Sequence, residues 1–149
     1  GDVKIEMLSN VAPKHVEHVN QLVAEGAYNG VVFHRVIEDF MAQTGDVKYG
    51  NKNSAEYNLN AVGTGGSSKP NLVAEFSDVS HERGIVSMAR SSHPNSANSQ
   101  FFICFDKAPW LDGEYTVWGR VIEGMDNIDK IKRGEPVQEP DFIEEAFIE

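Results

Sequence analysis

One short stretch of the chain combines a permanent positive charge with apolar side chains and an amide. Within residues 31–46, Arg35 is followed by Phe40, Met41 and Gln43. An arginine presents a rigid fork of N–H donors and stays protonated, and a glutamine adds a neutral hydrogen-bonding arm. The aromatic ring and the thioether supply apolar walls. The set contains no nucleophile, so its chemistry would be binding and electrostatic stabilisation rather than covalent catalysis.

Two short strands must position these residues. The stretch reads as two apolar runs on either side of an acidic turn at residues 38–39, which predicts a β-hairpin. Side chains alternate between the faces of a strand, so Phe33 and Arg35 are expected on one face and His34 and Val36 on the other. An ordinary structural interpretation competes with the functional one. The arginine could be solvated and the apolar residues could simply be core, where such residues mostly lie.

A second stretch favours the functional interpretation. Residues 84–105 read as a strand, a polar hairpin rich in Ser, Asn and Pro, and an aromatic strand. With FHRVIEDFMAQTGD at residues 33–46, GTGGS at residues 63–67 and WLDGEYTVWGRV at residues 110–121, this stretch closely resembles the cyclophilin family of peptidyl-prolyl cis/trans isomerases. The four motifs occur in the family's order and span most of the chain.

The reaction that the resemblance implies explains why an arginine would be needed. Rotation about an X-Pro bond crosses a barrier of about 18–20 kcal/mol because resonance gives the C–N bond partial double-bond character. In the twisted transition state the lone pair localises on the prolyl nitrogen, and a fixed N–H donor there stabilises that state selectively. Arg35 is the only side chain within residues 31–46 that is permanently charged and presents a rigid set of N–H donors. We expect neither a metal nor a cofactor.

The resemblance also implies which residues form the site. We expect Arg35, Phe40 and Gln43 to be catalytic. The expected substrate-binding residues line the proline pocket, hydrogen-bond the peptide or form the rim of the groove: Met41, Gly63, Ala89, Arg90, Ser91, Gln100, Phe102, Trp110, Leu111 and Tyr115. Gln100 is expected to support Arg35 from a neighbouring strand.

Two positions depart from the family's usual pattern. Tyr115 stands where relatives often have His, which keeps an aromatic wall but not a group that titrates near neutral pH. Arg90 stands where Asn is frequent, and it adds a second cation near the groove that could change the preference for the residue before proline. The hairpin at residues 91–99 is slightly longer than expected, so the register of Arg90 and Ser91 against the family stays open.

Size and composition indicate one compact domain. The chain has 149 residues, of which 40% are apolar and 24% charged, enough for a substantial core. The net charge of −10 argues against nucleic acid or an anionic membrane as partner, and no run approaches the ~20 apolar residues of a membrane span. We expect a soluble monomer of the cytoplasm, or of the bacterial periplasm if a signal peptide was removed upstream of Gly1. The acids after residue 134 read as a solvated end.

The rest of the chain reads as a barrel with two helices. Apolar patterning predicts strands over residues 2–8, 85–89, 100–105 and 116–122, a helix from Pro13 that ends before Gly26, and a second helix from Met125 closed by Gly134. Residues 46–63 read as a surface loop. The resemblance implies a mainly β fold, a closed antiparallel β-barrel of about eight strands capped by two helices. It also implies that the usual first strand is missing and that residues 141–149 form the closing strand.

Three features have both a functional and a structural interpretation. His15 and His18 stand one helical turn apart, a spacing that could bind metal, but no Cys or carboxylate cluster accompanies them, which favours a solvated face. GTGGS lacks the Lys-Ser/Thr of a phosphate-binding loop, and the resemblance places it at the groove rim. Cys104, the only cysteine, excludes an intrachain disulfide and is expected to be a buried packing residue rather than a reactive thiol.

The expected function is therefore isomerisation of X-Pro bonds in peptides and unfolded proteins, in support of protein folding. The alternative is a proline-peptide binding module or chaperone that uses the same groove without relevant turnover. A barrel without an active groove is disfavoured because the matched residues come from four separate segments. Trp110 further implies binding of cyclosporin-type cyclic peptides, with Tyr115 and Arg90 expected to weaken it.

Overall fold

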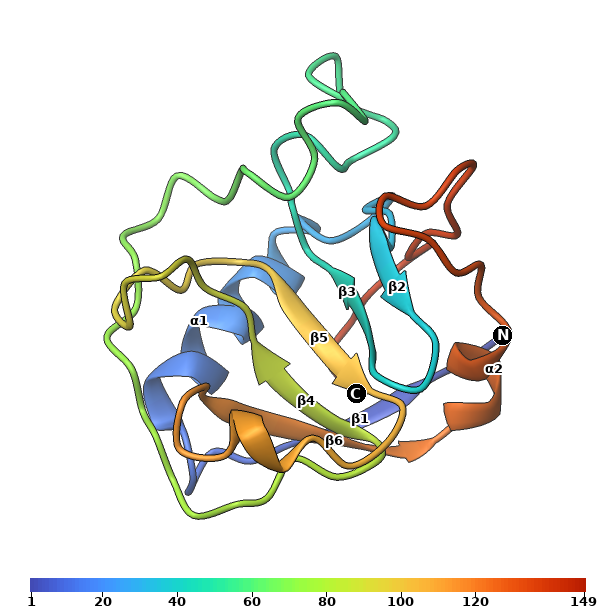
Figure 1. Ribbon diagram of the computed structural model, residues 1–149. Coiled ribbons are helices and arrows are strands. Elements are labelled where there is room, and N and C mark those ends of the chain that lie inside the picture. Colours follow the sequence, from blue (N-terminus) through green and yellow to red (C-terminus); the bar gives the residue numbers. More distant parts are fainter.

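Six antiparallel strands form one sheet in the computed structural model, which describes all 149 residues. The elements are β1 (Lys4–Met7), α1 (Pro13–Ala24), β2 (Arg35–Ile37), β3 (Met41–Thr44), β4 (Ile85–Met88), β5 (Phe101–Cys104), the 3-10 helix η1 (Pro109–Leu111), β6 (Val117–Glu123) and α2 (Met125–Asp129). Their order in the sheet is β1-β6-β4-β5-β3-β2, so β5 is central, and α1 lies behind the sheet in Figure 1. Neither helix has the length and apolar character that spanning a bilayer requires.

Alternation along the strands divides the interior into two apolar clusters. In β5, Phe101 and Ile103 belong to the larger cluster, which includes the buried face of α1. Phe102 and Cys104 point the other way and belong to a smaller cluster with Met41 of β3. Cys104 is fully buried among these apolar side chains, which confirms a packing role, and burial raises the pKa of its thiol to about 12. The smaller cluster lies on the face of the sheet that forms the candidate site.

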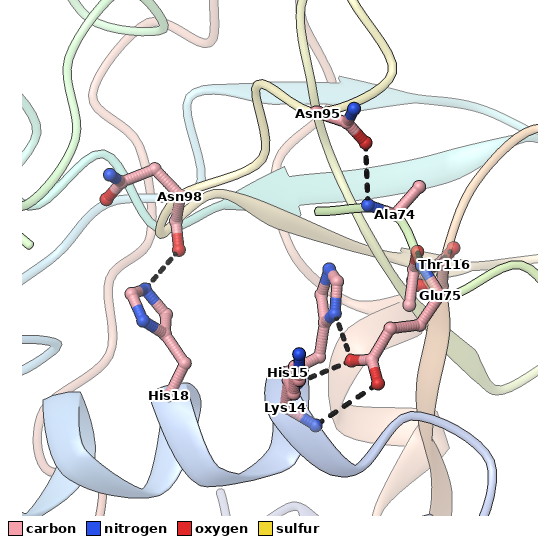
Figure 2. Close-up of polar contacts among 9 residues, drawn as sticks. Lys14, His15, His18, Ala74, Glu75, Asn95, Asn98 and Thr116 are labelled. Carbon is pink, nitrogen blue, oxygen red and sulfur yellow. Dashed lines mark hydrogen bonds and ion pairs between the residues drawn. The ribbon is translucent and has the colours of Figure 1, made fainter. Parts of the chain in front are cut away.

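A carboxylate from outside the helix caps α1. Pro13 begins the helix, and Ala12 at the N-cap position offers no side-chain acceptor. The carboxylate of Glu75 accepts hydrogen bonds from the backbone N–H groups of Lys14 (3.2 Å) and His15 (2.8 Å), as Figure 2 shows. Negative charge is favourable at a helix N-terminus. This contact therefore fastens the chain before β4 to the start of α1.

The two histidines of α1 are buried, so the expectation of a solvated face is wrong. His15 Nδ1 lies 2.6 Å from Glu75 Oε1, and His18 Nε2 lies 2.8 Å from the carbonyl oxygen of Asn98 (Figure 2). Burial lowers the pKa of both histidines and outweighs the acceptors that face them. Loops distant in sequence cover this side of the helix, which helical periodicity alone does not reveal. No cluster of three potential metal ligands occurs in the chain.

The mainly β architecture with two helices is as expected, but hydrogen bonds do not close the sheet into a barrel. β1 pairs only with β6, and β2 pairs within the sheet only with β3. Residues 141–149 are not a strand: they make one bridge, between Val32 and Phe142, and are otherwise irregular. Their adjacent acids interrupt the alternation that a strand with one buried face needs. Ile143 and Ala146 of this segment pack against the larger cluster instead.

Two local expectations also differ. Phe33 packs in the larger cluster together with Val36, while Arg35 lines a pocket on the other face. The regular strand begins only at Arg35, so the alternation cannot be extended back to Phe33. α2 ends at Asp129, before the Gly134 that was expected to close it. The remaining strands and α1 lie within a few residues of their expected positions.

Candidate active site

Nine of the residues expected from the sequence line one small pocket of about 150 Å³. They come from β2, β3, β5, the end of β4 and the segment around η1: Arg35, Phe40, Met41, Gln43, Ala89, Arg90, Phe102, Leu111 and Tyr115. Strand register explains the grouping. Gln43 of β3 pairs with Arg35 of β2 on one side and with Phe102 of β5 on the other, so the three side chains share a face.

Apolar and aromatic side chains form the walls of the pocket. Met41 is buried beneath it. The ring of Phe102 packs edge-on against Tyr115 with centroids 5.7 Å apart. Phe40 lies 5.7 Å from the ring of Trp110, which is 64% exposed at the rim. A cavity of this size with aromatic walls can hold a small apolar ring.

A chain of hydrogen bonds joins Arg35 to the glycine-rich loop. Arg35 Nη1 donates to Gln43 Oε1 (3.3 Å), and Gln43 Nε2 donates to Gln100 Oε1 (3.0 Å). Gln100 Nε2 donates in turn to the carbonyl oxygens of Gly63 (3.0 Å) and Gly65 (2.9 Å). Gln100 therefore reaches Arg35 through Gln43 rather than directly.

The buried carboxylate of Asp46 holds the same loop. It accepts hydrogen bonds from the N–H groups of Gly63 (2.8 Å) and Gly65 (3.0 Å), and also from those of Lys48 and Tyr49. A buried carboxylate needs such a set of donors when no cation pairs with it. The rim of the pocket is thus fixed before any ligand arrives.

Arg35 has one further partner, 100 residues away in the chain. Its Nε donates to Glu135 Oε2, although the two side chains are 40% and 58% exposed. Nη2 has no protein acceptor, so this end of the guanidinium is free to donate to a ligand. No local motif distinguishes Glu135 from the other acids of a segment that was expected to be solvated. Only the fold, through a bridge between Val36 and Gly134, brings it to Arg35.

Arg90 connects the hairpin after β4 to the segment after η1. Its Nε and Nη2 donate to the carbonyl oxygen of Glu114 (3.1 and 2.8 Å), and Nη1 donates to that of Ser91 (3.0 Å). The guanidinium carbon lies 4.6 Å from the centroid of the Tyr115 ring, within cation–π distance. The backbone N–H and C=O of Arg90 have no protein partner, so an extended peptide could pair with them.

The backbone N–H groups on either side of Arg90 are already occupied. That of Ala89 donates to the carbonyl oxygen of Gln100 (2.9 Å), and that of Ser91 donates to Ser96 Oγ (2.9 Å). Ser91 also lies outside the lining of the pocket. Of these three expected contact residues, only Arg90 offers a free backbone donor.

A Ser-His-Asp arrangement with a buried serine and histidine and an exposed aspartate lies behind the pocket, and it was not recognised from the sequence. His81 Nδ1 lies 2.9 Å from Asp112 Oδ1, and His81 Nε2 lies 2.8 Å from Ser87 Oγ. Ser87 is fully buried and donates to the carbonyl oxygen of Thr116 (3.0 Å), so it cannot reach a substrate as a nucleophile. The His81 ring stacks on Phe102 at 6.1 Å. The cluster therefore supports the pocket wall rather than performing acyl transfer.

A larger surface hollow, of about 680 Å³, contains none of the expected site residues. It is lined by parts of β1, β4 and β6, including Met7 and Ile85. Its arginine, Arg120, is already paired with Glu6. The small pocket is the better candidate because its apolar walls and polar groups converge on one enclosed volume.

Comparison with known proteins identifies the family. The family model described as "Cyclophilin type peptidyl-prolyl cis-trans isomerase/CLD" matches residues 1–148. A Brucella suis protein named "Probable peptidyl-prolyl cis-trans isomerase" is 57% identical over 154 residues, which cover 100% of this chain and 78% of the relative. "Peptidyl-prolyl cis-trans isomerase-like 3" of Mus musculus is 42% identical over 137 residues, 89% of this chain and 77% of the relative.

Solved structures agree with this result. A cyclophilin-type peptidyl-prolyl cis-trans isomerase of Cryptosporidium parvum, crystallised in the presence of the dipeptide Ala-Pro, superposes with a TM-score of 0.83 at 28% identity and covers 100% of this chain and 93% of its own. A cyclophilin of Hirschia baltica gives a TM-score of 0.80 at 28% identity, and the match covers 97% of this chain and 68% of that protein. The chain therefore belongs to the cyclophilin-type peptidyl-prolyl cis-trans isomerases and is an enzyme of that family.

Proposed function

We propose that this isomerase accelerates rotation about X-Pro bonds by donating a hydrogen bond from Arg35 to the prolyl nitrogen of the twisted peptide. The proline ring occupies the pocket beside Phe102 and Tyr115 while the acyl side of the bond turns. In the cis and trans ground states the nitrogen lone pair is delocalised into the carbonyl and accepts poorly. The donor therefore stabilises the transition state more than either ground state, which is the requirement for catalysis.

The observation that supports this role most strongly is how the guanidinium of Arg35 is held. Glu135 binds Nε and Gln43 binds Nη1, so the group is fixed at two points while Nη2 lacks a protein acceptor. A donor positioned before the reaction needs no reorganisation during it. One such donor is worth about 2.7–4 kcal/mol, or about 10²–10³ in rate.

The other expected residues act by holding the substrate. Gln43 orients Arg35, and Phe40 with Met41, Ala89 and Leu111 forms the apolar wall. Gly63 and Trp110 form the rim, and Gln100 supports Arg35 through Gln43. The free backbone of Arg90, next to Ser91, pairs with the extended peptide. Immobilising one side of a bond while the other rotates is a contribution of orientation, which suits a unimolecular reaction.

A proline-peptide receptor without relevant turnover is the second candidate. The pocket would serve it equally well, since an apolar ring needs only apolar walls. Binding a ring in its ground state does not, however, require a cation fixed at two points with one end unpaired. The Cryptosporidium relative was crystallised with Ala-Pro. We propose proline-containing peptides and unfolded chains as the ligand class here as well, and assistance of folding as the biological use.

A kinetic and a binding measurement together separate the candidates. Isomerisation of an Ala-Pro tetrapeptide is followed by a protease-coupled assay, and peptide affinity is measured by titration, for wild type, Arg35→Ala and Arg120→Ala. The last variant removes an arginine outside the pocket, where it pairs with Glu6. We expect Arg35→Ala to lose about 10²-fold or more in kcat/KM, with peptide affinity and the control nearly unchanged. Wild-type binding without acceleration would establish the receptor instead.

A further inference from the structure

Arg90 is the one arginine of the chain without an acidic partner. The other four are paired with carboxylates: Arg35 with Glu135, Arg83 with Asp129, Arg120 with Glu6 and Arg133 with Glu38. No carboxylate oxygen lies within 4.0 Å of the Arg90 guanidinium, and all its hydrogen bonds go to neutral backbone carbonyls. Of the two arginines that line the proline pocket, Arg35 is paired with a carboxylate and Arg90 is not.

The charge of Arg90 is also fixed in place. Its donors bridge the carbonyl oxygens of Glu114, Ser91 and Ser92, and its plane lies over the ring of Tyr115. A guanidinium has five N–H donors. Four hydrogen bonds are made, so one N–H remains for a ligand. A cation already ordered at the edge of a pocket loses little side-chain entropy when an anion binds to it.

We infer that the groove selects peptides that carry an acidic side chain next to the proline, with Arg90 as the specificity-determining residue. This inference rests on the proposed use of the pocket for proline. Once the ring is in the pocket and the peptide is paired with the free backbone of Arg90, a neighbouring carboxylate lies within reach of the same residue's guanidinium. The match is electrostatic, because the one remaining N–H can donate a charge-assisted hydrogen bond to a carboxylate.

The overall charge of the protein opposes a preference for acidic peptides. Such a preference would therefore have to come from the local charge of Arg90. At a net charge of −10 the molecule as a whole repels an acidic peptide. Repulsion by distant acids is screened beyond about 10 Å at 0.1 M salt, whereas a contact with Arg90 is screened less. At physiological ionic strength the local attraction should therefore dominate.

The test uses the intact chain and three peptides of the form Ala-X-Pro-Phe, in which X is Glu, Gln or Lys. Gln has the shape of Glu without its charge. Wild type should turn over the Glu peptide about fivefold faster in kcat/KM than the Gln peptide, with Lys slowest. A second series, with the same residues after the proline, shows which flank Arg90 reads. Equal kcat/KM across both series would overturn the inference.

Variants separate charge from structure. Arg90→Gln removes the charge and should bring the Glu-to-Gln ratio close to one, while Arg90→Lys restores a cation without the fork and should recover most of the ratio. Lys14→Gln is the matched control, because it lowers the net charge by the same amount on α1, which packs on the opposite face of the sheet. If Arg90→Lys behaved like Arg90→Gln, the residue would act only by bridging the two loops. If the control variant lost the ratio, the preference would be global.

The inference and the proposed function fail in different ways. An absence of acceleration with every peptide would refute the isomerase mechanism, and titration of the same peptides would still report any preference for Glu. Acceleration that is indifferent to X would leave the mechanism intact and refute the role of Arg90. The wild-type ratio should also shrink as salt is raised, which a purely steric preference would not do.

Discussion

Glu135 accepts a hydrogen bond from Nε of Arg35 across 100 residues of chain. Arg35 begins β2, whereas Glu135 follows α2, and the two meet because Gly134 bridges to Val36 of β2. The contact holds the guanidinium from the side opposite Gln43 and leaves Nη2 unpaired. The acidic segment after α2 therefore takes part in the site instead of being only a solvated end.

Removing this contact should lower the rate more than the affinity. In Glu135→Ala the guanidinium of Arg35 gains freedom, and we expect kcat to fall about three- to tenfold with little change in KM. The effect is modest because both side chains are substantially exposed and the pair is screened. Glu135→Gln keeps an acceptor for Nε and should lie between wild type and Ala. A rise in KM with kcat unchanged would show that the residue contacts substrate instead.

Stability should fall on mild acidification because of buried histidines. Burial lowers the pKa of His34 to about 4, and burial also lowers the pKa values of His15 and His18. Below pH 6.5 the unfolded chain takes up protons that the folded chain resists. The contribution of these histidines to the free energy of unfolding is therefore completely present above pH 6.5, and it declines as the pH falls from 6.5 towards 4. His34 alone accounts for about 3 kcal/mol of this decline.

Urea unfolding at a series of pH values measures this slope. A His34→Phe variant serves as comparison: its absolute stability can change in either direction, but its loss between pH 6.5 and 4 should be smaller than that of wild type. A wild-type stability that stays constant over this window would contradict the neutral, buried state of these histidines.

Trp110 should report binding of a cyclosporin-type cyclic peptide. Its indole is 64% exposed beside Phe40, whereas the other tryptophan, Trp118, is buried in the larger cluster. Titration should change the fluorescence of wild type but not of Trp110→Phe, which retains Trp118. We expect weaker binding than in the best cyclophilin binders because Tyr115 and Arg90 alter the groove. Absence of inhibition at roughly tens of micromolar would exclude the assigned rim.

β1, an edge strand, should be less protected from hydrogen exchange than the central strand β5. It hydrogen-bonds to β6 on one side only, whereas β5 has partners on both. Unpaired N–H groups on an edge exchange readily, and the charges of Lys4 and Glu6 discourage another strand from docking there. Hydrogen exchange of Lys4–Met7 is compared with that of Phe101–Cys104. Equal, strong protection would mean that another segment covers the edge.

Local sequence patterns predicted the strands within residues 31–46 and α1, whereas the family resemblance implied the grouping of the pocket residues. These depend on alternation and on register, as with Arg35, Gln43 and Phe102, which pair across three neighbouring strands. Alternation failed only at Phe33, which lies before the regular strand begins at Arg35.

Contacts between distant segments could not be predicted in the same way. The burial of His15 depends on Glu75, which arrives from another part of the chain, and the pairing of Arg35 depends on Glu135. Each acid looks like any other surface acid in its own sequence context. The segment 141–149 lacks clear alternation, and the family resemblance overruled that signal in favour of a strand that the structure does not contain.

The central claim is that Arg35 acts on the rotated bond and not on the bound ground state. Its most direct test is the cis/trans exchange rate of a proline peptide while bound, measured by NMR exchange spectroscopy under saturation, for wild type and Arg35→Lys. Lysine keeps the positive charge but loses the fixed fork. We predict similar peptide affinity and bound-state exchange at least about 10²-fold slower in the variant. Exchange within twofold of wild type in the saturated variant would contradict the mechanism.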